Sequence, residues 1–165
     1  MRLLVSALAM LLAGEASARC VLPEYVSRDA EAAARYLLDN EHVVMEAIVR
    51  ELPRGDQSLF QRVEVLRYVK GSGPLMLDIW PGPAKRATHE ILNTDEWGRI
   101  DAPTGARVVT ALRRTPFGWT VGECAYQALA VPGVGDVLRN REWVAAFQKQ
   151  REREASAGGK GAAGQ

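Results

Sequence analysis

Two cysteines are the residues of this 165-residue chain whose chemistry is easiest to assign. Cys20 follows an apolar N-terminal segment, and Cys124 lies near the end of the region with strand patterns. An even number of cysteines in an exported protein normally pairs, because oxidising compartments favour the disulfide. A metal site would need more ligands, and neither His42 nor His89 has ligand spacing relative to the cysteines. We predict a structural Cys20–Cys124 disulfide; a Cys–His nucleophile is an alternative that no other residue supports.

Two short motifs begin like known chemical sites but are incomplete. His89-Glu90 could open a His-Glu-x-x-His zinc motif, yet Asn93 stands where the second histidine is required. Gly71-Ser72-Gly73 follows a predicted strand but is not followed by the Gly-Lys-Ser/Thr of a phosphate loop. We therefore predict a surface loop at the first motif and a hairpin turn at the second.

Acidic residues are the remaining candidates for metal or acid–base chemistry. Asp95, Glu96 and Asp101 lack the regular alternation of oxygen ligands found in calcium loops. The chain has neither a Gly-x-Ser-x-Gly elbow nor a convincing acid pair for glycoside hydrolysis. We predict no catalytic residue, no metal site and no cofactor.

A few side chains are better suited to binding than to reaction. Trp97 lies between Glu96 and Gly98 in the least regular stretch of the chain, which makes it the best candidate for an exposed contact. Arg113 and Arg114 belong to a modest basic cluster that solvent or an anionic ligand would explain equally well. The cluster also includes Arg107. Four aromatic residues could either pack in the core or form a binding platform, namely Phe60, Tyr68, Trp80 and Trp97.

The N-terminus has the features of an export signal. Met1-Arg2 is basic, residues 3–13 are almost entirely apolar, and Ala16-Ser17-Ala18 has the small-x-small form that signal peptidase accepts. The apolar stretch is about half of the roughly 20 residues that cross a bilayer, and Ser17-Ala18-Arg19 does not fit a lipoprotein signal. We predict removal of residues 1–18 near Ala18, which would leave a periplasmic or extracellular protein.

The composition argues against two classes of partner. Charged residues make up 25% of the chain, but the net charge is only +1. Because nucleic-acid-binding domains usually carry a strongly basic surface, we expect no nucleic-acid partner. No later segment is long and apolar enough to span a membrane, so we expect no membrane span.

Helices are predicted at both ends of the mature chain. An apolar stripe at helical spacing predicts one over 27–38, with Ser27 as its cap. A second is predicted over 132–154, where Trp143 pairs with Phe147 one turn later. The Gly/Ala/Ser-rich residues 155–165 predict a disordered tail.

Strands are predicted between the two helices. Alternating apolar residues indicate that each strand has one buried face. The basic pair Arg113-Arg114 with Pro116 is expected to form the last turn. The stretch 84–104 has no clear period, apart from one possible helical turn near 89–92. Short hairpins with one long excursion favour a small barrel whose strands cover 43–50, 59–69, 75–79, 106–112 and 117–121.

The order of five sequence features resembles the netrin-module and tissue-inhibitor-of-metalloproteinase-like OB-fold proteins. The resemblance covers about residues 20–124 and implies a five-stranded OB-like Greek-key barrel over 19–131. This fold would be mainly β, with one N-terminal and one C-terminal flanking helix and a disulfide that ties the barrel ends. The features are Cys20 at the mature N-terminus, a first strand at 43–49, a second strand ending in Lys70-Gly71, a strand that begins at Gly105, and Cys124.

The sequence departs from these inhibitors where their function resides. Their N-terminal cysteine chelates a protease zinc through a free amine and a carbonyl, whereas Arg19 is predicted to precede Cys20 here. Cys20-Val21-Leu22 also replaces their Cys-x-Cys start. We predict an exported, non-catalytic binding module with a protein partner, contacted through 84–104 or the C-terminal helix. The alternative is an inhibitor of a secreted or envelope metalloprotease.

Overall fold

The computed structural model describes residues 20–51, 60–80, 100, 102–116 and 118–158. Its strands close into a barrel in the order β1-β2-β3-β5-β4. The strands are β1 (Val43–Glu51), β2 (Gln61–Lys70), β3 (Met76–Ile79), β4 (Arg107–Thr115) and β5 (Gly118–Thr120). The helices are α1 (Glu24–Arg28), α2 (Ala30–Asn40), α3 (Glu123–Leu129), α4 (Val134–Arg139) and α5 (Arg141–Gly158).

Strand pairing confirms the predicted fold class, an OB-like barrel flanked by helices. β1 pairs antiparallel with β2 on one side and with β4 on the other. β3 pairs antiparallel with β2, and β3 meets β5 in parallel through Ile79 and Trp119, which closes the barrel. β5 returns antiparallel to the end of β4.

The barrel interior follows the alternation that the sequence predicts. On β1, every second residue from Val43 to Val49 is buried and faces the core. On β2, the inward positions include Gln61, whose side chain is fully buried together with its apolar neighbours. Residues opposite one another in an antiparallel pair share a face, so Thr110 lies inward with its partner Met45.

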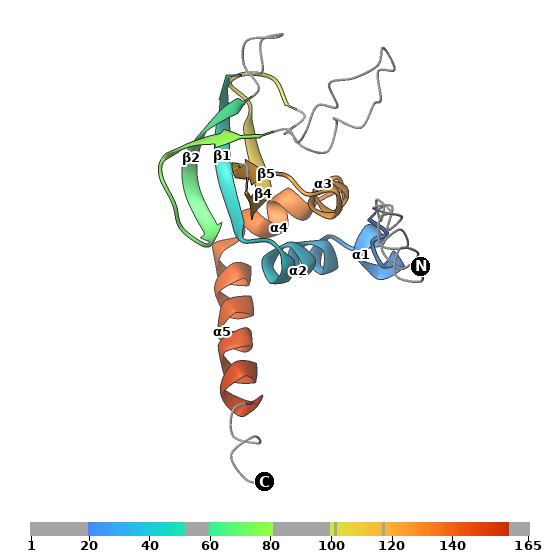
Figure 1. Ribbon diagram of the computed structural model, residues 1–165. Helices are drawn as coiled ribbons and strands as arrows, with labels where there is room; N and C mark the ends of the chain where they lie inside the picture. The colour runs from blue at the N-terminus through green and yellow to red at the C-terminus, as the bar shows by residue number, and fades with distance from the viewer. Residues whose placement is uncertain (1–19, 52–59, 81–99, 101, 117, 159–165) are drawn as a thin grey trace, which may run out of the picture.

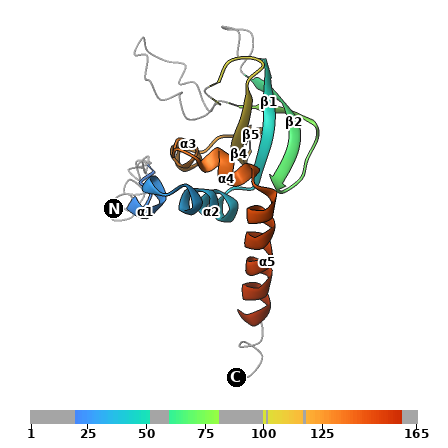
Figure 2. The same ribbon diagram turned by 180° about the vertical axis from the view of Figure 1, so that it is seen from behind.

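The helices α1 to α4 gather at one end of the barrel (Figures 1 and 2). The predicted helix over 27–38 is split in two, and Asp29 rather than Ser27 caps the longer part. The Asp29 side chain accepts a hydrogen bond from the Ala32 amide at 2.6 Å, as an N-cap residue does. The Ser27 hydroxyl instead donates to the Glu24 carbonyl within α1 at 2.9 Å.

The C-terminal part also forms two helices where one was predicted. Asn140 separates α4 from α5, and its side-chain oxygen accepts hydrogen bonds from the amides of Glu142 and Trp143, each at 3.1 Å. The predicted Trp143–Phe147 pair is confirmed as a stack with ring centroids 5.8 Å apart. Helix α5 extends away from the barrel in both views (Figures 1 and 2) and continues to Gly158, past the predicted start of the tail at Ala155.

Two further elements differ from the sequence prediction. β4 continues through Arg113 and Arg114, which pair with β5 instead of forming a turn. Helix α3, which follows Gly122, was not predicted at all. The turn at Gly71 is confirmed: Gly71 has a φ of +77°, and an added Cβ there would lie 2.8 Å from the His42 carbonyl oxygen.

Within the described ranges, no helix combines the length and the apolar character needed to cross a bilayer.

Candidate binding site

The predicted disulfide is present and joins the start of the described chain to α3. Cys20 and Cys124 are separated by 104 residues in sequence, and their Cα atoms lie 5.3 Å apart. Two side chains of α3 also bind the backbone of Cys20. The Cys20 amide donates to the Glu123 carboxylate at 3.1 Å, and the Gln127 amide donates to the Cys20 carbonyl at 3.2 Å. Both backbone groups of Cys20 are therefore engaged within the molecule.

The two arginines predicted as a contact have structural neighbours. Arg113 makes a bidentate pair with Glu41, with guanidinium–carboxylate distances of 2.7 and 3.3 Å. The Glu41 side chain, directly after α2, is fully buried, so Arg113 neutralises a carboxylate in the protein interior. These hydrogen bonds raise the pKa of Arg113 above its ordinary value. The Arg114 guanidinium lies 6.0 Å from the ring centroid of Trp119. Trp97 lies outside the described residues.

Arg107 is not part of a cluster with these two arginines. It lies at the opposite end of β4 and binds Glu46 at 2.8 Å, while Arg139 of α4 binds the same carboxylate oxygen at 3.0 Å. Arg67 approaches the other oxygen at 3.9 Å. The hydrogen bond from Arg107, supported by Arg139, lowers the pKa of Glu46 below its ordinary value although burial opposes this shift.

The aromatic residues of the alternative platform are only partly separated: Phe60 and Trp80 flank the paired residues Gln61 and Ile79, whereas Tyr68 lies toward the other end of β2. Phe60 precedes β2, whereas Tyr68 lies near its other end and donates its hydroxyl to the Pro74 carbonyl at 2.8 Å. The Trp80 amide donates to the Trp119 carbonyl at 2.7 Å, next to the β3–β5 contact. The candidates His89, Glu90, Asp95, Glu96 and Asp101 fall outside the described residues, and within those residues no cluster suited to a metal ion is present.

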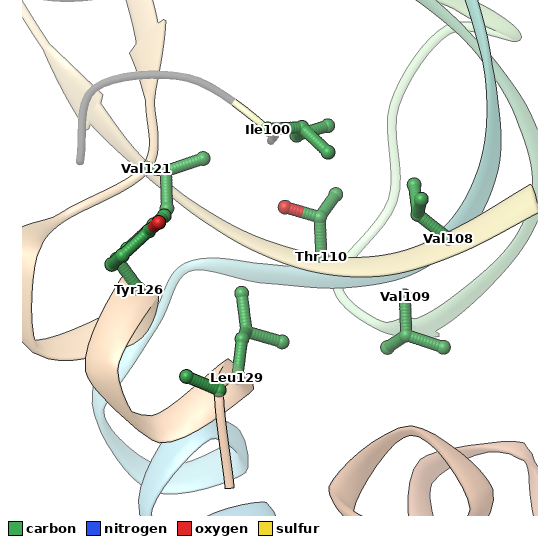
Figure 3. Close-up of a pocket in the computed structure, with 8 residues that line it drawn as sticks. Ile100, Val108, Val109, Thr110, Val121, Tyr126 and Leu129 are labelled. Carbon is green, nitrogen blue, oxygen red and sulfur yellow. The ribbon is translucent and has the colours of Figure 1, made fainter. Parts of the chain in front are cut away.

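A pocket between β4 and α3 is the site that the structure itself brings together. We call it the β4–α3 pocket; its volume is about 260 Å³. Its walls come from separate parts of the chain (Figure 3), and among the described residues none of those that line it is charged. The lining residues are Ile100, Val108, Val109, Thr110, Val121, Tyr126, Leu129 and Ala130.

Thr110 gives this apolar pocket its unusual polar feature. The residue is only 1% exposed, and its hydroxyl has no hydrogen-bond partner among the described residues. In Figure 3, the Thr110 side chain lies on the same side of the β4 ribbon as the side chains of Ile100 and Val121. A buried hydroxyl without a partner is costly, and such groups are rare in folded proteins. The oxygen is enclosed by its neighbours, so a ligand group that paired with it and removed that cost would have to displace part of the pocket wall.

Gln61 fixes one wall of the β4–α3 pocket. Its buried side-chain amide donates to the Ile100 carbonyl at 3.0 Å and accepts from the Ile100 amide at 2.8 Å. Both backbone groups of Ile100 are thus bound by one side chain of the barrel interior. This arrangement holds the Ile100 side chain beside Thr110 without any regular secondary structure.

Reasoning from the sequence did not find this pocket. Thr110 reads as an ordinary strand residue, and α3, which supplies Tyr126 and Leu129, was not recognised. The inward polar position of Gln61 was the one available signal, because a polar side chain in a barrel interior needs a specific partner. Comparison with known proteins adds no further assignment: no family model, no curated protein and no solved structure matches this chain.

Proposed function

We propose that this protein is an exported, non-catalytic binding module that contacts a protein partner through the β4–α3 pocket. The observation that carries the proposal is a pocket whose described lining residues are uncharged and include one buried hydroxyl without a described partner. Binding sites for small or apolar groups are typically concave and apolar, with few polar groups that fix orientation. The lining residues provide apolar contacts and the Thr110 hydroxyl, which together can recognise a partner side chain.

The scaffold also supports a recognition role. The Cys20–Cys124 disulfide fixes α3 to the N-terminal segment, and the Gln61 amide fixes Ile100. A site held by rigid elements loses little conformational entropy when it binds a partner. The predicted export signal at residues 1–18 agrees with this disulfide, since such bonds persist in oxidising compartments.

Position-specific cross-linking tests this proposal. A photoreactive phenylalanine derivative replaces Leu129 at the pocket or, as a matched control, the exposed Lys149 on α5. Both variants are first checked by mass for the Cys20–Cys124 bond. We expect cells that export the protein to yield a defined adduct from position 129 and none from position 149. Equal adducts from both positions, or no adduct from folded protein at position 129, would contradict the proposal.

Metalloprotease inhibition is the alternative function, and the Cys20 environment weighs against it. Zinc chelation would require the amine and carbonyl of Cys20, which Glu123 and Gln127 already bind. Two mature forms, beginning at Arg19 and at Cys20, can be compared against a zinc endopeptidase. We expect neither form to inhibit the enzyme. Inhibition by the Cys20 form alone would favour the alternative.

A further inference from the structure

One edge of β4 has no strand partner over part of its length. β1 occupies the other edge along Arg107–Leu112, and β5 pairs with β4 only from Arg113 to Thr115. Among the described residues, the first part of β4 therefore pairs on one side only. We call this the free edge of β4.

Backbone hydrogen bonds show which residues present their polar groups at the free edge. The carbonyls of Ala106 and Leu112 accept from the amides of Val49 and His42, at 3.0 and 3.1 Å. Even-numbered residues of this stretch therefore direct their backbone groups toward β1, and the pairing has no register shift between these points. Since backbone groups alternate sides along an antiparallel strand, Arg107 and Val109 direct theirs toward the free edge.

The β4–α3 pocket surrounds this same edge. Three consecutive residues, from Val108 to Thr110, line it, although neighbouring side chains on a strand point to opposite faces. A single pocket reaches all three only if it passes around the strand edge. Figure 3 shows this arrangement: Thr110 lies on one side of the ribbon with Ile100, and Val109 lies on the other side.

We propose that the partner contributes an extended peptide segment that pairs with the free edge of β4 and places neighbouring side chains on either side of it. This inference rests on the proposed function and specifies its binding mode. Strand addition supplies main-chain hydrogen bonds for affinity, and pockets for alternate side chains supply specificity. The N–H and C=O groups of Arg107 and Val109 lie two residues apart, which is the spacing at which an added strand forms backbone hydrogen bonds.

The pocket walls define the side chains that this segment carries. A charged side chain would lose its hydration without gaining an ion partner from the described part of the wall, because none of the described lining residues is charged. An apolar cavity of about 150 Å³ accepts benzene, so a pocket of about 260 Å³ has room for one aromatic ring and a smaller neighbour. When the wall around it opens, the Thr110 hydroxyl pairs best with a ring that carries a hydrogen-bonding group, and tyrosine satisfies both conditions.

A panel of capped pentapeptides tests the binding mode on the full mature chain. The host is acetyl-Thr-Val-X-Val-Thr-amide, with X as tyrosine, phenylalanine or lysine, and binding is followed by amide NMR signals. We expect the tyrosine peptide to bind most tightly, to slow exchange of the Val109 amide and to leave the Lys149 signal unchanged. Phenylalanine should bind about 5-fold more weakly, the effect of one hydrogen bond of about 1 kcal/mol. Lysine should not bind.

Two controls separate the binding mode from the proposed function. Methylating alternate peptide nitrogens should weaken binding about tenfold or more, because main-chain hydrogen bonds are lost while side chains remain. Thr110→Val should abolish the preference for tyrosine over phenylalanine without abolishing binding. Equal binding of the methylated peptide, no binding by any peptide, or a Val109 amide already protected in the free protein would overturn strand addition. A position-129 adduct obtained alongside these results would leave the proposed function standing.

Discussion

Two buried carboxylates, Glu41 and Glu46, are each neutralised by arginine side chains from other elements. Glu41 depends on Arg113 alone among the described residues, whereas Glu46 has Arg67, Arg107 and Arg139 nearby. Removing one partner from a buried ion pair is strongly destabilising, because the remaining charge stays in the protein interior. The two carboxylates should therefore respond differently to the loss of one arginine.

The Arg113→Met variant tests this difference. We expect it to lower the free energy of unfolding by roughly 2–3 kcal/mol, because Glu41 would be left buried without its cation. Arg107→Met is the matched control and should cost much less, since Arg139 still binds the same oxygen of Glu46. Urea denaturation at pH 7 measures both. Equal losses in the two variants would contradict the roles assigned here.

Glu46 should also make stability depend on pH. Its pKa is lowered in the folded state by Arg107 and Arg139, so its ionised form stabilises the fold above the ordinary glutamate pKa of about 4.3. That stabilisation is lost as the pH falls from about 4.3 through the lowered pKa. Glu46→Gln should reduce the loss of stability over this acidic range. Denaturation curves at pH 7, 4 and 3 would show it, and an unchanged pH dependence in the variant would contradict it.

The alternating pattern predicted which face of a strand each residue occupies, but not which elements pack against that face. Alternation along β1 correctly placed Val43, Met45, Ala47 and Val49 inward. It also placed Glu46 on the opposite, polar face, yet Glu46 is only 4% exposed. A strand pattern reports which face a side chain occupies, whereas helix packing against that face depends on distant residues such as Arg139.

At the scale of elements, the start of a helix was predicted incorrectly where two nearby residues could each serve as its N-cap. Ser27 and Asp29 are both good N-cap residues, and the apolar stripe does not distinguish starts two positions apart. Likewise, the basic character of Arg113-Arg114 favoured a turn, but the structure pairs Arg113 with a buried carboxylate far away in sequence. Helix α3 is short, and helices of this length depend on tertiary packing more than on propensity.

The two candidate caps can be compared directly. Asp29→Ala should destabilise the protein by about 1 kcal/mol, because the Ala32 amide loses its hydrogen bond at the start of α2. Ser27→Ala should have a much smaller effect, since its hydroxyl serves an exposed carbonyl in α1. Thermal unfolding followed by circular dichroism measures both. A larger loss in Ser27→Ala than in Asp29→Ala would contradict the observed helix boundary.

At the scale of the whole molecule, the Cys20–Cys124 bond encloses the entire barrel in one covalent loop. In the chain-entropy model, closing a loop of about 100 residues stabilises by up to about 4.7 kcal/mol, and measured values are typically 2–4 kcal/mol. The double variant Cys20→Ser with Cys124→Ser should therefore unfold at a markedly lower denaturant concentration.

An intact-mass measurement checks the starting point of this prediction. Alkylation of the mature protein should add mass only after treatment with a thiol reductant. The same spectrum would report whether cleavage occurs near Ala18. Alkylation without reductant would contradict the disulfide, and equal stability of the double variant would contradict its contribution.

The position of the disulfide also determines how the molecule would respond to mechanical force. With the bond intact, tension applied between Cys20 and the end of α5 acts on the chain through Cys124. Only the helices after Cys124 could then lengthen, while the barrel would be shielded from the pull. A partner that pulls on α5 would therefore unravel α5 and α4, and the pull would not extend the strands while the bond holds.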